Sequence, residues 1–145
     1  MEIVRASSSL PFVSPVTYVD GIPMLDGGIV DSIPVEYASR QGYEKLIVVL
    51  TRNKGYRKKA SRMRIAKVFY RKYPNLQKAL SERNAEYNRT MDIIERMEEE
   101  GKITVIRPVR PIEVGRMEKD TAKLTALYQE GYDIAEKLIE EHSLF

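Results

Sequence analysis

The sequence predicts an α/β fold, because runs typical of buried strands alternate with long amphipathic helices. Residues 45–50, Lys-Leu-Ile-Val-Val-Leu, have the continuous aliphatic character of a strand that is buried on both faces of a parallel sheet. Residues 102–106 predict a second strand of this kind. A complete doubly wound domain has about five or six strands, so we expect the chain to form one part of an α/β sandwich whose sheet is mostly parallel.

The first third of the chain predicts short strands and a tight turn. Residues 17–19 and 22–25 flank an Asp-Gly dipeptide at 20–21, which tolerates the positive φ angles of a hairpin turn. The hairpin would place Asp26 at its end. Pro34 then favours the start of a short helix.

Three more helices are predicted further along the chain. A basic helix at 61–73 is separated by Pro74 from a longer helix, which Gly101 would close. The stripe of the longer helix is Leu76, Leu80, Arg83, Tyr87, Met91, Ile94 and Met97. The last helix begins near Asp120 or Thr121, either of which can cap its free N–H groups. Its stripe is Leu124, Leu127, Tyr128, Gly131, Ile134, Ala135, Leu138 and Ile139.

The composition narrows the classes of protein and site. With 145 residues, of which 43% are hydrophobic, the chain can bury one core, and we expect residues 1–145 to belong to one domain. No apolar run approaches the roughly 18 to 20 residues of a membrane-spanning helix, and the first residues lack a secretory signal, so we expect a cytoplasmic protein. The chain has no cysteine and one histidine, and we expect neither a metal nor a cofactor.

The segment Asp26-Gly27-Gly28 is the strongest candidate for chemistry. A carboxylate followed by two residues without side chains lets the backbone turn sharply and lets a substrate approach closely. Taken alone, the pattern is also that of an ordinary loop. Its surroundings, with Ala-Ser-Ser-Ser-Leu-Pro-Phe at 6–12, Asp-Gly at 20–21 and Pro34 downstream, resemble the patatin-like phospholipases in order and spacing. The segment 115–120 resembles the bacterial branch of that family.

This resemblance implies a three-layer α/β/α sandwich and a Ser-Asp dyad that cleaves acyl esters of lipids. Asp26 would be the dyad carboxylate that activates the serine without a histidine, and Gly27 and Gly28 would shape its turn. A carboxylate is a weak base toward an alcohol in water. Asp26 therefore has to be partly desolvated and within hydrogen-bond reach of the nucleophile.

The nucleophile of such a dyad is not found in this sequence. The family places its serine in a Gly-x-Ser-x-Gly elbow and its oxyanion donors in a glycine-rich loop, both N-terminal to the aspartate. No serine here has glycine two residues away on both sides. The resemblance implies that Ser7, Ser8 and Ser9 end a helix and pack near the active site. The alternative is that one of these hydroxyls, which are close in sequence to Asp26, is the nucleophile. We therefore expect the C-terminal portion of a patatin-like domain without its nucleophile-bearing part.

Residues 51–73 form a strongly basic segment, with ten Lys or Arg and no Asp or Glu in a chain whose net charge is only +3. Arg57, Lys58, Lys59 and Arg62 are candidates for contact with anionic phospholipid headgroups, each worth roughly 1 kcal/mol near a charged bilayer. The simplest alternative is a solvated surface helix. We expect no nucleic-acid partner, because no recognised binding motif accompanies these residues.

The functional hypothesis is a portion of a patatin-like serine hydrolase that supplies the catalytic aspartate and is inactive alone. Its substrate would be a lipid ester, and peripheral contact with an anionic membrane would accompany it. One alternative is a noncatalytic binding or regulatory module with a patatin-like fold. A further alternative is a basic nucleic-acid-binding domain.

We predict that the chain forms a homo-oligomer. An incomplete sheet has an unpaired edge, and the helices beside it leave part of their apolar stripes uncovered, which favours self-association. Light scattering should therefore give a mass above the 16.7 kDa of one chain. A monodisperse monomer would contradict this expectation.

Overall fold

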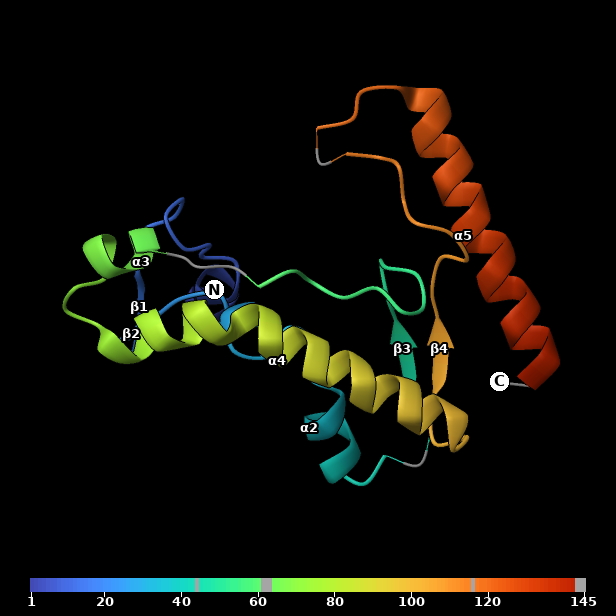
Figure 1. Cartoon of the computed structure of the whole chain (residues 1–145), viewed down its shortest axis with the longest axis horizontal. Helices are drawn as coiled ribbons and strands as arrows, with labels where there is room; N and C mark the ends of the chain where they lie inside the picture. The colour runs from blue at the N-terminus through green and yellow to red at the C-terminus, as the bar shows by residue number, and fades with distance from the viewer. Residues whose placement is uncertain (44, 61–63, 116, 143–145) are drawn as a thin grey trace. The chain divides into compact units, whose positions relative to one another are not determined.

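The computed structural model describes residues 1–43, 45–60, 64–115 and 117–142 (Figure 1). The chain divides into two compact units, Met1–Pro34 with Arg57–Asp92 and Val35–Tyr56 with Ile93–Phe145. The helices are α1 (Glu2–Ser7), the one-turn helix η1 (Gly27–Ile29), α2 (Val35–Arg40), α3 (Arg64–Phe69), α4 (Pro74–Glu99) and α5 (Thr121–His142). The strands are β1 (Thr17–Val19), β2 (Ile22–Met24), β3 (Ile47–Val49) and β4 (Thr104–Ile106).

The first unit contains the predicted hairpin. Strands β1 and β2 are antiparallel, with Thr17 opposite Met24 and Val19 opposite Ile22. Asp20 and Gly21 both have positive φ angles, 50° and 76°, as a tight two-residue turn requires. The hairpin prediction is confirmed, and the chain leaves β2 directly into the Asp-Gly-Gly loop.

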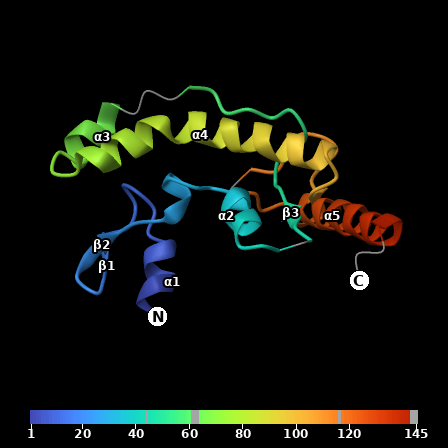
Figure 2. The same cartoon turned by 90° about the horizontal axis from the view of Figure 1, so that it is seen from below.

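A small core holds this loop and the helices of the first unit together. Ile29, Ala66, Tyr70 and Leu80 are buried in one cluster, against which Leu25, Leu76 and Ala79 pack. In Figure 2, α3 and the first part of α4 lie on one side of this unit, with α1 and the hairpin on the other. The Tyr70 hydroxyl also accepts a hydrogen bond of 2.9 Å from the Phe12 N–H. This bond helps to hold Phe12, a non-glycine residue with a φ of 67°.

The second unit contains the predicted parallel strand pair. Strands β3 and β4 run in the same direction in Figure 1, with Ile47 beside Thr104 and Val49 beside Ile106. The expected combination of helices, strands and a parallel pair is therefore confirmed. Each sheet among the described residues has two strands, and the larger three-layer sandwich stays a prediction.

The expectation that the run at 45–50 is buried on both faces is wrong for this chain. Ile47 and Val49 are 42% and 71% exposed, whereas Leu50 is buried. Residues 47 and 49 share one face of the strand because side chains alternate, and neither is buried by the rest of the chain. The aliphatic run correctly indicated a strand, but not how much of it is covered.

The helices mostly begin and end where the sequence indicated. Helix α4 is followed by Gly101 with a φ of 68°, and α5 is capped by Asp120, whose Oδ1 accepts from the Ala122 N–H at 2.9 Å. Helix α3, described over Arg64–Phe69, ends before the predicted end at residue 73. Residues 61–63 of the predicted helix lie outside the described part. Within the described ranges, no helix is both long enough and apolar enough to cross a bilayer.

Truncating Leu80 should destabilise the first unit. Leu80 is 2% exposed and belongs to the cluster that contains Ile29. We expect Leu80→Ala to lower the free energy of unfolding by about 2 to 5 kcal/mol, because it removes buried methyl groups and leaves a cavity. Leu124→Ala, at a position that is 41% exposed, is the matched control and should cost about 1 kcal/mol or less. Equal losses in urea denaturation would contradict the assigned core.

Candidate functional site

The Asp-Gly-Gly loop is fixed by hydrogen bonds on both sides of Asp26. The Asp26 N–H donates to the Ser9 carbonyl at 2.9 Å. The Asp26 Oδ1 accepts from the Gly28 N–H at 2.7 Å, so that the carboxylate caps η1. Short polar side chains make this bond to an N–H two residues ahead when the backbone turns. The loop therefore has a defined conformation that orients the carboxylate.

The second carboxylate oxygen of Asp26 is available. Among the described residues, Oδ2 has no hydrogen-bond partner, and the residue is half-buried. A carboxylate can accept through both oxygens. Asp26 thus uses one oxygen to hold its own loop and keeps the other for an outside donor.

Gly28 is more constrained by this geometry than Gly27. A Cβ at Gly28 would lie 3.0 Å from the Asp26 Oδ1, the atom that accepts the Gly28 N–H. A Cβ at Gly27 would meet nothing within 4 Å. Both residues were predicted to shape the turn, and the structure gives a specific steric reason at Gly28.

Arg83 anchors the loop from helix α4, a role that the sequence reasoning missed. Its Nε donates to the Gly28 carbonyl at 3.0 Å, and the Ser32 hydroxyl donates to the same oxygen at 2.8 Å. The signal was present, because Arg83 is the one charged residue within the apolar stripe of α4. A cation in such a stripe needs a buried acceptor, and Gly28 supplies it.

The serine run ends α1 and supports the loop. Helix α1 stops at Ser7, as expected, and the Ser9 hydroxyl bonds the Arg5 carbonyl and the Thr17 hydroxyl, both at 2.8 Å. The Ser8 hydroxyl also bonds carbonyls of α1. In the described part of the chain, no serine hydroxyl hydrogen-bonds the Asp26 carboxylate. These contacts favour a structural role for the run.

The candidate lipid-contact residues lie along α4. The Arg57 guanidinium pairs with Asp92, with Nη2 and Oδ1 2.6 Å apart, and the Lys58 ammonium lies 3.6 Å from the centre of the Tyr87 ring. Lys59 is exposed, and its backbone carbonyl accepts a hydrogen bond of 2.8 Å from the Asn84 side chain. Arg62 lies outside the described residues.

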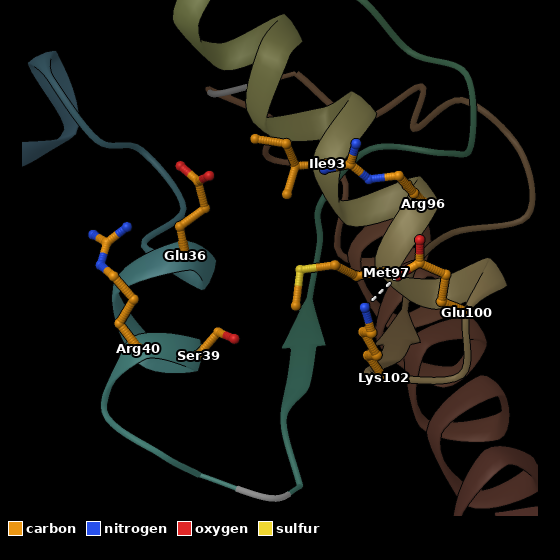
Figure 3. Close-up of a pocket in the computed structure, with 8 residues that line it drawn as sticks. All are labelled: Glu36, Ser39, Arg40, Ile93, Arg96, Met97, Glu100 and Lys102. Carbon is orange, nitrogen blue, oxygen red and sulfur yellow. Dashed lines mark ion pairs between the residues drawn. The ribbon is translucent and has the colours of Figure 1, made fainter.

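The second unit contains a polar pocket of about 380 Å³, shown in Figure 3. Glu36, Ser39 and Arg40 approach it from α2, opposite side chains at the end of α4. On the α4 side, the Lys102 Nζ lies 2.6 Å from the Glu100 Oε2, and the hydrogen bond and charge of Lys102 lower the pKa of Glu100. Charges of both signs line the pocket. Within the described ranges, no group of three or more His, Asp or Glu side chains could hold a metal ion.

The comparisons with known proteins divide the chain. The family described as "Domain of unknown function (DUF6363)" matches residues 73–145, half of the chain. The chain belongs to this DUF6363 family. The family described as "Patatin-like phospholipase" matches residues 1–39, which contain the Asp-Gly-Gly loop, and it supports a patatin-like relationship for this part.

A relative is the "Uncharacterized protein YjjU" of Escherichia coli (strain K12). It is 46% identical over 52 residues, which are 35% of this DUF6363 chain and 15% of the relative. The matched part is thus a small share of that longer protein.

The two matched segments meet within the first unit. The patatin-like segment contributes the Asp-Gly-Gly loop, and the DUF6363 segment contributes Arg83 and Leu80, which hold that loop from α4. Helix α4, which lies in the DUF6363 segment, therefore helps to hold the candidate site in place.

Two alanine substitutions test the loop geometry. Gly28→Ala should lower the free energy of unfolding by about 1 to 2 kcal/mol, because the new Cβ displaces the Asp26 carboxylate from the Gly28 N–H. Gly27→Ala is the matched control, and it should be neutral or stabilise the chain by up to about 1 kcal/mol, since it only restricts the unfolded state. Chemical denaturation of both variants measures the difference. A destabilisation by Gly27→Ala equal to that by Gly28→Ala would contradict the Asp26–Gly28 contact.

Proposed function

We propose that this chain supplies the carboxylate of a patatin-like Ser-Asp dyad that hydrolyses lipid esters. Asp26 would act as the base toward a serine hydroxyl of a patatin-like segment beyond these 145 residues. The attack of that serine on the ester carbonyl would form an acyl-enzyme, which water would then hydrolyse. Alone, the chain would be inactive.

The observation that carries this proposal is that the two carboxylate oxygens of Asp26 differ in their hydrogen bonding. Oδ1 is held by the Gly28 N–H, and Oδ2 lacks a partner among the described residues. A base that orients a nucleophile needs one such free acceptor on a carboxylate whose rotation is restricted. An ordinary loop aspartate needs only the Oδ1 contact, so the free Oδ2 and the patatin-like match of residues 1–39 support the proposal together.

The surroundings of the loop support a positioned base. Ile29, directly after the two glycines, is buried in the core cluster, and the Gly28 carbonyl accepts from both Arg83 and Ser32. A catalytic group has to be held by neighbours whose own positions are fixed. Arg83 is in this view a positioning residue for Asp26.

Peripheral contact with an anionic lipid surface is part of the proposal. In the first unit, Val68 and Phe69 of α3 are exposed, and Phe69 is 64% exposed. The exposed residues Arg71 and Lys72 follow them directly. Exposed apolar side chains next to cations are typical of a helix that lies in a membrane interface. Lys59 and Arg62 would add to the same charge.

Replacing Asp26 tests the catalytic assignment. The test protein adds to this chain an N-terminal patatin-like segment with the Gly-x-Ser-x-Gly elbow and the glycine-rich loop. In it, Asp26→Asn should lower kcat/KM for a short-chain nitrophenyl ester by about 10² to 10⁴-fold, because the amide is not a base. The asparagine carbonyl can still accept the Gly28 N–H, so the melting temperature should change little.

Asp31→Asn is the matched control, since Asp31 is an exposed carboxylate five residues further along the chain. It should keep activity within about twofold. Unchanged activity in Asp26→Asn would remove Asp26 from the mechanism. Serine-dependent hydrolysis by the 145-residue chain alone would show that the chain does not need a nucleophile from elsewhere.

A further inference from the structure

A basic segment without regular secondary structure, residues 57–59, runs along helix α4 in the first unit (Figure 2). Among the described residues, its backbone makes no hydrogen bond to another backbone group. Side chains of α4 hold it instead. Asn88 bonds both backbone groups of Lys58, accepting from the N–H at 2.7 Å and donating to the carbonyl at 2.9 Å. Asn84 donates to the Lys59 carbonyl at 2.8 Å.

Two cations of this segment are also held by α4. The Arg57 guanidinium lies 2.6 Å from the Asp92 carboxylate, and the Lys58 ammonium lies 3.6 Å from the centre of the Tyr87 ring. Asp92 balances the charge of Arg57, and the ring face attracts the Lys58 ammonium to the helix. In the docked segment these two side chains therefore contact α4, whereas Lys59 is exposed.

The residues of α4 that hold the segment form one row, because Asn84, Asn88 and Asp92 are spaced four apart along the helix. Asparagine is unfavourable in the interior of a helix, since its side chain competes for backbone groups. Helix formation therefore does not explain two asparagines in the middle of the 26-residue helix α4. Their bonds to the backbone of residues 58 and 59 give them a role.

The attachment is of a kind that opens locally. It consists of polar contacts near the surface, and residues 57–59 do not belong to the buried core of the first unit. Segments held in this way open at a much lower free energy than a packed core helix. A competing anionic surface would also weaken the ion pair between Arg57 and the exposed Asp92.

We propose that residues 57–59 form a latch that, when closed on α4, withholds Arg57 and Lys58 from an anionic bilayer surface and, when open, presents both to it. This inference rests on the peripheral lipid contact proposed above and adds how that contact is regulated. The open form offers the surface all three cations, whereas the closed form offers Lys59. Binding to the surface therefore shifts the equilibrium toward the open form.

Replacing both asparagines by alanine tests the attachment. The double variant Asn84→Ala/Asn88→Ala removes the side-chain bonds to the backbone of the latch, leaves the net charge unchanged and favours the helix itself. Hydrogen exchange of residues 55–60, followed by mass spectrometry, should become about tenfold faster. Ser81→Ala is the matched control, because Ser81 is an exposed residue of α4 whose hydroxyl bonds the Lys78 carbonyl. It should leave this exchange unchanged.

Vesicle binding connects the latch to a lipid surface. The double variant should bind vesicles of equal parts phosphatidylglycerol and phosphatidylcholine about tenfold more tightly than the original chain, because it presents two more cations to the charged bilayer. Ser81→Ala should bind them like the original chain. Adding Arg57→Gln and Lys58→Gln to the double variant should remove the gain. In the original chain, these vesicles should speed the hydrogen exchange of residues 55–60, whereas vesicles of phosphatidylcholine alone should not.

Failure of the latch and failure of the lipid contact give different results. If the original chain binds anionic vesicles and the double variant binds them no more tightly despite faster exchange, the latch does not regulate a contact that nevertheless exists. If neither protein binds, the lipid contact itself is absent, and so is its regulation. Unchanged exchange in the double variant would mean that the asparagines do not hold the segment. A larger gain in affinity for duplex DNA than for the vesicles would identify a nucleic acid as the partner instead.

Discussion

The Asp-Gly-Gly loop depends on its attachment to helix α4. Ile29 is buried with Leu80 in one cluster, and Arg83 donates to the Gly28 carbonyl from the same helix. The apolar contact resists separation of the loop from the helix because it would expose buried surface. The polar contact fixes the loop's rotation because a hydrogen bond is directional. The two interactions together explain how a loop with two adjacent glycines keeps one conformation.

This attachment joins the two matched segments of the chain. The patatin-like segment contains the carboxylate, and the DUF6363 segment contains the helix that supports it. Asp26 is therefore positioned by residues far along the chain, and its Oδ2 remains open among the described contacts. In the proposed dyad, this oxygen would accept from a further donor. The proposed serine would be that donor.

The second unit presents a different kind of incomplete pairing. Its parallel strands leave Ile47 and Val49 exposed, and a buried guanidinium nitrogen of Arg107 has no acceptor among the described residues. Apolar surface and a buried donor are each unfavourable when left unmatched.

Local features were predictable from the sequence because their causes lie within a few residues. The Asp-Gly turn, the Gly101 stop, the Asp120 cap and the parallel strands at 47–49 and 104–106 follow from backbone preferences and hydrophobic periodicity. The Asp26 turn was predicted for the same kind of reason, whereas the end of α1 at Ser7 was expected from the patatin-like resemblance.

Only the tertiary structure decided which distant residues meet. It joined Gly28 to Arg83 and Phe12 to Tyr70, because such contacts depend on how the elements pack and not on local propensity. It also left β3 exposed on one face, since burial depends on covering elements that a strand's own sequence does not specify.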